Sequence, residues 1–583
     1  MNQTQENSRE ILQQAIDARI KSFKLEESAE SVRVLRHERN ALAPVSSLPS
    51  EIFAAIFSFL CSSGKPSHRL ARLRLSHVCH QWREIILHQP LLWSHVDFTT
   101  LSSAGVAEIL ARAKSVPLYF EARTSGPRRN DDQFHTFRKE LQACISRIRH
   151  LSISAECAEI RSTIRALESP APTLEYLSLS SADGEDVSIP DTLFDGSAPR
   201  LSWLKLRHCS ISWKWPLLKS LKYLEIIRPF EGSIPNLAIW LDALAEMTEL
   251  KSLTFNRTFP NAPSFPYHVE RTVTLPSLTH FDIVARLEDR VFTLAHLDLP
   301  ALTHLSLDAI YIWPPNSGDL QKLLLYVARY TYGTHHSQPL QSMLIRNNQS
   351  YVDLLAWAVP DIGVEVHESG RPTLLGATLA PRLALSFRCR SDTYYYSHLA
   401  LFELLIAGLP LDNIETLAAQ DLCRHADLEL HAKQFWLHIS PSFPQLRRVR
   451  LSPPTARGFI NMLLEDGERP PLPSLTELSV VDASEYDLRA LRLRNVLRKR
   501  VEQGVPLEVL DLRMCCQCRN YKGQLRRLNE RFVVNVLCPE SYEARKHMRS
   551  LWKPVPLGVF LDDDREDDES DSDSEDEEES DEE

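Results

Sequence analysis

The sequence predicts an α/β protein, with a short helical module, a long array of parallel strands and an acidic end. Three observations support this prediction. Apolar residues stand at helical spacing over residues 48–98, the phrase L-x-x-L-x-L then recurs over several hundred residues, and the last part of the chain is almost entirely acidic residues and serine. A chain of 583 residues, 43% of them hydrophobic, has room for several domains or one large repeat array.

The first element is an amino-terminal helix, which we assign to residues 1–43. The stretch from Arg9 to Leu42 is rich in Glu, Arg, Lys, Gln and Ala and has only sparse apolar residues. Their spacing does not sustain the three or four heptads that a coiled coil needs. We therefore expect this helix to pack against the module that follows it, and self-association through a short coiled coil is the alternative.

The second element, residues 44–98, is a helical module with more apolar surface than it can bury by itself. Leu48-Pro49 opens its first helix, since proline is tolerated in a first helical turn. Two apolar rows follow side by side, Ile52, Ile56 and Leu60 in one, Phe53 and Phe57 in the other. A second helix is predicted from about Leu70 to Leu87. A helix that faces water needs only a limited apolar stripe, so the surplus predicts a docking module. An ordinary helical hairpin without a partner is the alternative.

This stretch resembles an F-box, the module that joins a substrate receptor to the Skp adaptor of a cullin–RING ubiquitin ligase. The positions that carry the resemblance are Leu48, Pro49, Glu51, Ile52, Ile56, Leu60, Val78, Cys79, Trp82, Arg83, Leu92 and Trp93. The segment between Leu60 and Val78 is several residues longer than is typical, which is similar to members of the large fungal F-box families. The resemblance implies adaptor contacts, some of which will instead be internal core, at Leu48, Pro49, Ile52, Ile56, Leu60, Val78, Trp82, Leu92 and Trp93.

The third element, residues 99–540, is the repeat array. Copies of L-x-x-L-x-L, with some anchors replaced by other apolar residues, begin at Ile148, Leu174, Leu201, Leu221, Leu250, Leu278, Leu302, Leu446, Leu475 and Leu507. The second anchors of the first seven copies are 20 to 29 residues apart, close on average to a leucine-rich repeat. The alternation predicts a short strand with one buried face, and such units bury that face only by stacking, each strand pairing with the next.

We therefore predict an irregular leucine-rich-repeat horseshoe with a parallel sheet inside and helices or turns outside. This arrangement also resembles the receptor half of many F-box proteins. The rhythm is loosest between Asp308 and Ser440, where candidate strands begin near Leu340, Leu383 and Ile414. A non-repeat insertion is the alternative for that span.

The array predicts a binding face. Because the anchors point into the core, the residues that flank the last two anchors point out onto the concave face of the sheet. They are Tyr176, Trp203, Lys205, Arg207, Tyr223, His280, Asp282, His304, Arg448, Arg450, Asp511 and Arg513. Exposed Trp, Tyr and Arg dominate binding hot spots, so we expect a protein substrate here, contacted by Tyr176, Trp203, Arg207, Tyr223, His280, His304, Arg448 and Arg450. The alternatives are solvated strand residues, or rings packed under a loop.

The last segment, residues 541–583, ends in an acidic tail. Asp562–Glu583 holds 17 acidic residues and one arginine, whereas the whole chain has a net charge of −11, so the rest of the chain is slightly basic. So dense a block repels itself and buries nothing, and we expect it to be disordered. It is either a solubilising tail, a segment that binds basic proteins such as histones, or a phosphorylation substrate.

Other patterns predict no chemistry. Cys515 and Cys518 have the spacing of one zinc-binding pair, with Cys516 between them, but only Cys538 follows where a second pair is usual. His335-His336 has no further ligand at a useful spacing, and SSGK lacks the leading glycine of a phosphate-binding loop. We expect no metal, no cofactor and no catalytic activity.

The sequence shows no signal segment and no membrane-spanning apolar run, so we expect a cytosolic or nuclear protein with reduced cysteines and no membrane or nucleic-acid partner. The predicted role is that of a substrate receptor in a ligase that also contains the Skp adaptor and a cullin. A scaffold that uses its F-box outside any ligase and a histone or basic-protein binder are the alternatives.

Overall fold

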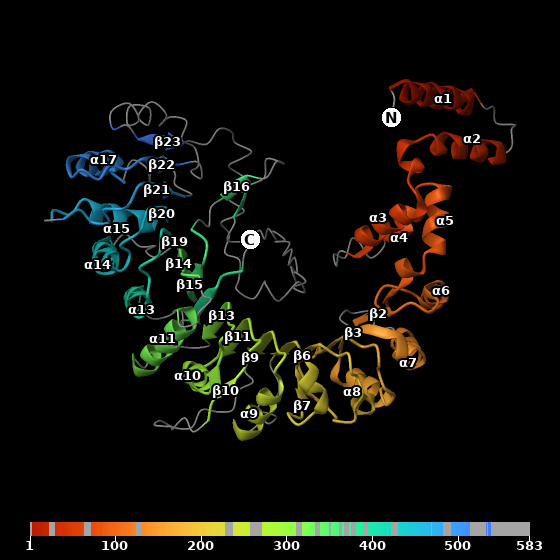
Figure 1. The fold of residues 1–583 in the computed structure, drawn as a ribbon, viewed down its shortest axis with the longest axis horizontal. Helices are drawn as coiled ribbons and strands as arrows, with labels where there is room; N and C mark the ends of the chain where they lie inside the picture. Colours follow the sequence, from red (N-terminus) through yellow and green to blue (C-terminus); the bar gives the residue numbers. More distant parts are fainter. Residues whose placement is uncertain are drawn as a thin grey trace, which may run out of the picture. The chain divides into compact units, whose positions relative to one another are not determined.

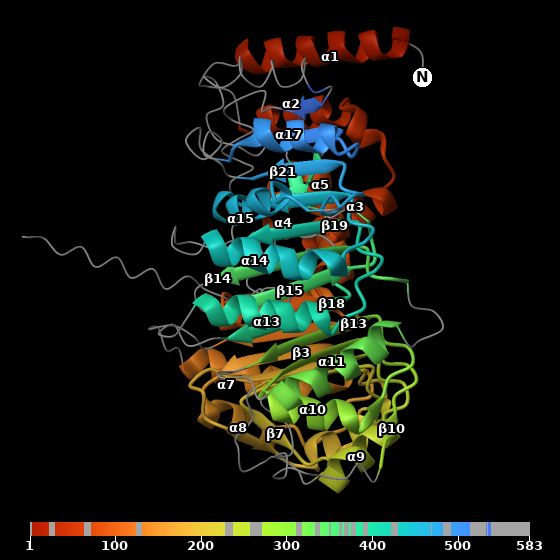
Figure 2. The same ribbon diagram turned by 90° about the vertical axis from the view of Figure 1, so that its left-hand side faces the viewer.

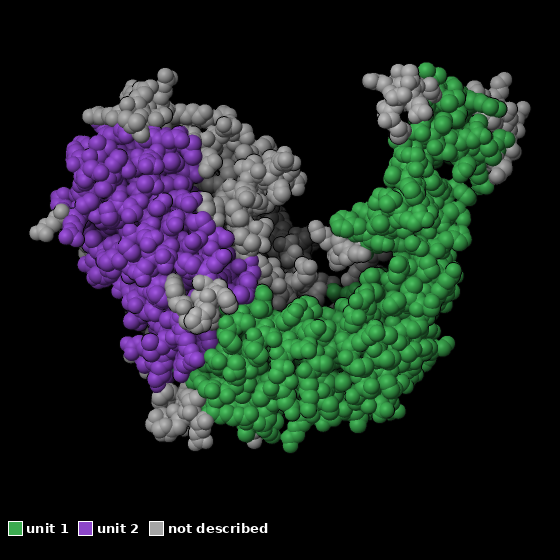
Figure 3. All heavy atoms as spheres, in the orientation of Figure 1, with its two compact units in different colours: residues 1–302 green, residues 303–583 purple. Residues whose placement is uncertain are grey.

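The computed structural model has two compact units, residues 1–302 (unit 1) and residues 303–583 (unit 2), which Figure 3 colours separately. Figure 1 shows the elements in chain order. The structure describes residues 3–22, 29–62, 71–123, 131–227, 237–256, 271–309, 317–332, 338–348, 351–360, 364–366, 372–374, 380–388, 395–420, 429–467, 469–481, 491–512, 532 and 534–537.

The amino-terminal segment forms two helices, where the sequence analysis expected one. Helix α1 (Gln3–Ser22) and helix α2 (Ala29–Ala41) contact each other, and Arg39 Nε donates a hydrogen bond of 2.7 Å to Asp17 Oδ1. Helix α2 also reaches the helical module, because the rings of His37 and His80 meet edge to face with centroids 5.5 Å apart. The expected packing against the module is therefore present, and it is made by the second helix.

The helical module contains the 3-10 helices η1 (Pro44–Ser47) and η3 (Pro90–Trp93) and the helices α3 (Ser50–Ser62), α4 (Ala71–Ser76) and α5 (His80–His88). The prediction of one unbroken second helix is wrong. Ser76 Oγ donates to the carbonyl of Leu73 at 2.7 Å, and Cys79 takes an extended backbone, with φ −157°. Serine hydroxyls compete with the helical backbone in this way, and the chain turns between α4 and α5.

The sheet of unit 1 is parallel, and its strands pair in chain order. They are β1 (His95–Asp97), β2 (Leu118–Arg123), β3 (Ile148–Ala155), β4 (Tyr176–Ser181), β6 (Trp203–Arg207), β8 (Tyr223–Ile227), β9 (Ser252–Asn256) and β11 (His280–Ala285). The predicted second anchors, all buried, lie side by side in register: Leu151, Leu177, Leu204, Leu224, Leu253 and Phe281. The stacking predicted for these copies is thus confirmed.

Helices and short strands return the chain between these strands. The helices are α6 (Ser103–Ala113), α7 (Asp131–Cys144), α8 (Cys157–Ala166), α9 (Leu237–Glu246) and α10 (Leu287–Ala295). Strands β5 (Val187–Ile189) and β7 (Cys209–Ile211) form a small parallel pair, as do β10 (Val273–Thr274) and β12 (Leu297–Asp298). Figure 1 shows α7, α8 and α9 on one side of the strands, so that the other face of the sheet carries the residues between the anchors.

In unit 2 the strands do not all pair in chain order. Strand β13 (His304–Ala309) pairs with β18 (Leu383–Arg388), and β18 pairs antiparallel with β15 (Tyr351–Trp357). Strand β15 pairs antiparallel with β14 (Ser342–Asn348), and β14 pairs with β19 (Thr416–Gln420). The sheet then continues in parallel and in chain order through β20 (Arg448–Leu451), β21 (Glu477–Val480), β22 (Val509–Asp511) and β23 (Asn535–Leu537).

The three candidate strands of the loose span therefore exist, as β14, β18 and β19, but the expectation that each strand pairs with the next is wrong here. The reversed strand β15 is held by a buried charge: Arg346 donates to Asp353 Oδ2 at 2.9 and 2.6 Å, and Ser386 donates to Asp353 Oδ1 at 2.7 Å. Strands β16 (Val364–Val366) and β17 (Pro372–Leu374) form a separate antiparallel pair. The Asp353 carboxylate thus links three neighbouring strands, β14, β15 and β18.

The helices of unit 2 are α11 (Ser317–Tyr332), α13 (Tyr395–Ala407), α14 (Glu429–Ile439), α15 (Pro453–Leu463) and α17 (Leu493–Glu502). Figure 2 shows α13, α14 and α15 stacked in chain order. Among the described residues, none of the helices is both long and apolar enough to cross a membrane.

Candidate interaction surfaces

The core of the helical module is aromatic. Phe53 and Phe57 on α3 are buried, and the ring of Trp82 on α5 lies 5.8 and 5.0 Å from theirs. Ile86 is also fully buried, and its carbonyl accepts a hydrogen bond of 2.8 Å from Trp93 Nε1. These contacts decide which of the two apolar rows on α3 faces inward: it is the phenylalanine row.

A buried arginine ties the module to the first strand of the sheet. Arg72 on α4 donates to the carbonyls of Leu92 and His95 at 3.3 and 2.9 Å. Its guanidinium carbon lies 5.3 Å from the ring centroid of Trp93, and that of Arg112 on α6 lies 4.6 Å from the same ring. Burial lowers the pKa of Arg72 below its usual value. The cation thus joins the end of the module to β1 with fixed geometry.

The second apolar row on α3 faces solvent. Ile52 is 47% exposed and Ile56 41% exposed, and Leu60 extends the same row by a turn. Leu48 and Pro49 are exposed just before the helix, where the Pro49 carbonyl accepts hydrogen bonds from the backbone N–H groups of Ile52 and Phe53. An aliphatic row left in water beside an aromatic core is a surface on which a partner can gain apolar burial.

The predicted adaptor residues divide into three groups. Exposed are Leu48, Pro49, Ile52, Ile56, Leu60 and Val78, whereas Trp82 is half-buried against the phenylalanine rings. Leu92 and Trp93 are buried, and for these two the implied surface contact is corrected. They complete the core beneath α5 and the junction with β1, so a partner has no access to them in this structure.

Four exposed apolar residues of the module are absent from the predicted adaptor positions: Val45, Phe59, Leu73 and Leu91. Phe59 is 81% exposed on α3, and Leu73 is exposed on α4. Phe59 stands seven residues after Ile52, two helical turns along the same stripe, so the helical spacing contained the signal. For Leu73 the sequence contains no such signal, because the apolar pattern does not show that α4 ends in a turn.

The second surface is a row of rings across the unit 1 sheet. One residue from each of six neighbouring strands stands in register: His95, Tyr119, His150, Tyr176, Trp203 and Tyr223. Successive ring centroids lie 4.3, 5.9, 3.9, 5.6 and 4.4 Å apart. We call this row the aromatic ladder. It includes three of the predicted substrate contacts, and Trp203, 40% exposed, is prominent among them.

The histidines of the ladder are held neutral. Burial, followed by the charge of His95, lowers the pKa of His150 to about 4, and burial lowers the pKa of His95 as well. Near neutral pH the ladder is therefore an uncharged surface of aromatic rings.

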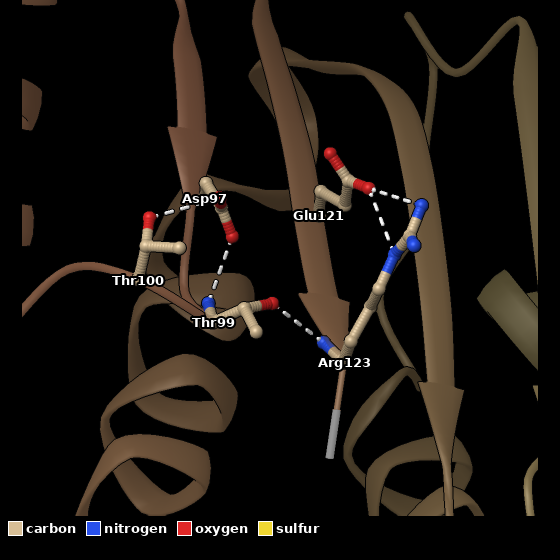
Figure 4. A network of polar contacts seen from close by, with 5 residues as sticks. All are labelled: Asp97, Thr99, Thr100, Glu121 and Arg123. Atoms are coloured by element: carbon tan, nitrogen blue, oxygen red, sulfur yellow. Dashed lines mark hydrogen bonds and ion pairs between the residues drawn. The ribbon is translucent and has the colours of Figure 1, made fainter. Parts of the chain in front are cut away.

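A polar row runs beside the ladder, two residues farther along each strand. At its start Asp97 accepts hydrogen bonds of 2.9 Å from the Thr99 backbone N–H and from the Thr100 hydroxyl, as Figure 4 shows. The Arg123 side chain pairs with Glu121, while its backbone N–H donates to Thr99 Oγ1 at 3.0 Å. This network fastens the ends of β1 and β2 together.

The polar row continues through Lys205 and Glu225, which form an ion pair of 3.3 Å on adjacent strands. Arg207 lies two residues beyond Lys205 on β6 and is half-buried. His280 is exposed on β11, separated from Tyr223 by Ser252 on the strand between them. Of the predicted substrate contacts, five thus lie on the unit 1 sheet.

The remaining predicted contacts lie in unit 2. His304 on β13 and Arg448 and Arg450 on β20 are half-buried. Asp511, expected on the open face, is instead buried, which corrects that expectation. Arg513 lies outside the described residues.

The sequence analysis also missed half of the ladder. His150 follows from the same flanking rule that found Tyr176, since it precedes the anchor Leu151, so its signal was present. His95 and Tyr119 stand on strands without a complete L-x-x-L-x-L phrase, and the repeat pattern alone could not find them.

Among the described residues, no three His, Cys, Asp or Glu side chains are grouped so as to hold a metal ion. The candidates Cys515, Cys516, Cys518 and Cys538, the pair His335-His336 and the acidic tail Asp562–Glu583 all lie outside the described part of the chain.

Comparison with known families gives one match, to the model described as F-box-like, over residues 45–99. This range contains the exposed row, the aromatic core and the junction with β1. A search of curated proteins finds no match.

Proposed function

We propose, from the F-box-like region at residues 45–99, that the chain is the substrate receptor of a cullin–RING ubiquitin ligase. F-box domains typically bind the Skp adaptor. The observation that carries the proposal is the exposed aliphatic row on α3, set against a core already filled by Phe53, Phe57 and Trp82. Because the core is complete without them, Ile52 and Ile56 are available to an adaptor groove.

The strand array supports the proposal that the chain binds a target protein. In unit 1 the anchors of consecutive copies pair in register and the intervening helices lie on one side, which supports assignment to an irregular leucine-rich-repeat array. The open face then presents aligned rings and charged side chains, residue types that anchor protein interfaces. We assign the target protein to this face.

The mechanism under this proposal is proximity. The F-box-like region docks on the adaptor, the array holds the target, and the assembly keeps lysines of the target at high local concentration beside a ubiquitin-loaded enzyme. The chain itself then makes and breaks no covalent bond. The proposed place of action is the cytosol or the nucleus.

The test is adaptor capture by full-length variants. Replacing Leu48 and Pro49 together by alanine removes an exposed apolar residue and the proline that opens α3, and adaptor capture should be lost. The matched control is Leu325→Ala, because Leu325 is exposed on α11 far along the sequence. Capture that persists in the double variant contradicts the proposal.

The acidic tail favours a second candidate function, that of a binder of histones or other basic proteins. Its 17 acidic residues can attract such partners without any folded site. Deletion of Asp562–Glu583 separates the two functions, because binding to basic proteins should vanish while adaptor capture persists.

A further inference from the structure

A pocket of about 600 Å³ lies in unit 1, where the chain enters strands β4, β6, β8 and β9. Its lining includes the cations Arg200, Lys219 and Lys222, the carboxylates of Glu175 and Glu249, and Thr248. Sites for small apolar ligands are lined mostly by apolar and aromatic side chains. Polar and charged side chains predominate in this lining, so the matching ligand is a charged group.

The charges of the pocket do not cancel. Its lysines and carboxylates belong to three ion pairs: Arg149–Glu175 at 2.7 Å, Lys219–Glu246 at 3.4 Å and Lys222–Glu249 at 4.0 Å. Arg200 is exposed, and within the described part of the chain its guanidinium has neither an ion pair nor a hydrogen bond. The pocket, taken with its ion-pair partners, therefore has one positive charge more than its carboxylates neutralise.

An excess of one positive charge matches one carboxylate. A guanidinium binds a carboxylate through two parallel hydrogen bonds, and Arg200 is available for this pairing. Thr248, whose side chain makes no hydrogen bond to the described residues, offers a hydroxyl donor at the same pocket. A phosphate dianion fits less well, because its second negative charge would stand unbalanced in a pocket that already contains Glu175 and Glu249.

The pocket adjoins the aromatic ladder. Three of the residues that line it stand immediately before the ladder residues Tyr176, Trp203 and Tyr223 in the sequence. Trp203 is 40% exposed, and its ring stacks on that of Tyr223 with centroids 4.4 Å apart. A bound acidic side chain therefore lies next to uncharged ring surface, which a neighbouring residue of the same bound segment can cover. Such burial of an aromatic residue beside a charged contact is typical of protein interfaces.

We propose that this pocket binds an acidic side chain of the target protein, with Arg200 as the residue that pairs with its carboxylate. The target segment that carries the acidic residue then lies across the adjoining end of the aromatic ladder. This inference rests on the proposed function, since it names the class of segment that the substrate face takes. Commitment to this one occupant comes from the single unbalanced cation in a polar pocket.

The probe is an octaglutamate peptide, labelled with fluorescein at its amino terminus and amidated at its carboxyl terminus. It is titrated with full-length protein and followed by fluorescence anisotropy. Saturable binding is expected for octaglutamate, and none for an octaglutamine peptide with the same label. Arg200→Gln should weaken binding by about tenfold, because the charged hydrogen bonds to the carboxylate are lost. Arg200→Lys keeps the charge but not the two parallel donors, so its affinity should be intermediate.

The matched control is Arg165→Gln, because Arg165 is exposed on α8 and does not line this pocket; its peptide binding should be unchanged. Equal binding of octaglutamine, absence of saturable octaglutamate binding, unchanged affinity in Arg200→Gln, or an equal loss in Arg165→Gln would overturn the inference. Adaptor capture is measured on the same samples. Lost capture in the unchanged protein is the failure of the proposed function, whereas intact capture without octaglutamate binding is the failure of this inference alone.

Discussion

The exposed row on α3 makes a quantitative prediction for the double variant Ile52→Ala/Ile56→Ala. The two side chains are 47% and 41% exposed, so a partner that covers both buries the equivalent of roughly one whole isoleucine. Full burial of such a side chain contributes about 1.5–3 kcal/mol. Since about 1.4 kcal/mol corresponds to a tenfold change in affinity, the variant should bind the Skp adaptor about ten- to a hundredfold more weakly.

The assay is isothermal titration of purified full-length protein with the Skp adaptor. The matched control is Leu404→Ala/Val501→Ala, whose side chains are 39% and 47% exposed on α13 and α17. This control loses a similar apolar area outside the F-box-like region and should bind as the unchanged protein does. An unchanged affinity in the Ile52/Ile56 variant, or an equal loss in the control, would refute the assignment of this row to the adaptor.

Three further predictions concern stability. Phe57→Ala should lower the free energy of opening the F-box-like region by about 3–5 kcal/mol, measured as faster amide exchange in α3. Asp353→Ala removes the buried carboxylate that pairs with Arg346 and accepts from Ser386, and should cost about 3–5 kcal/mol in urea unfolding, whereas Asp466→Ala, at an exposed carboxylate, should leave the midpoint unchanged. The pKa of His150 is lowered to about 4 in the folded chain, so as the pH falls the unfolded chain takes up this proton first, near pH 6.5. The free energy of unfolding should therefore decrease between pH 6.5 and pH 4, and it should decrease less steeply in His150→Gln.

The repeat pattern predicted the strands of unit 1, where each copy of L-x-x-L-x-L pairs with the next copy along the chain. Each L-x-x-L-x-L phrase contains its own buried face, so the anchors Leu177, Leu204 and Leu224 could be assigned before any pairing was known. In unit 2 the same reasoning located strands but not their order. Strand β15 follows β14 as its antiparallel partner, with Asn348 opposite Tyr351, and carries no L-x-x-L-x-L phrase, so the repeat pattern contains no information on this reversal or on the pairing of β15 with β18.

The proposed adaptor surface on α3 was likewise predictable only in part. The sequence contains both apolar rows of α3, but the placement of Trp82 against Phe57 decides which row is core, and that contact joins different helices. Leu92 and Trp93 follow the F-box pattern, yet the Arg72 junction with β1 buries them. Pattern alone identifies the module, whereas three-dimensional packing separates its surface from its core.

Co-purification of the full-length chain with the Skp adaptor and a cullin tests the central claim most directly. We expect the three proteins to elute as one stoichiometric complex in size-exclusion chromatography with light scattering. A chain that elutes alone at its own mass of 66.6 kDa, with adaptor and cullin in a separate peak, would contradict it.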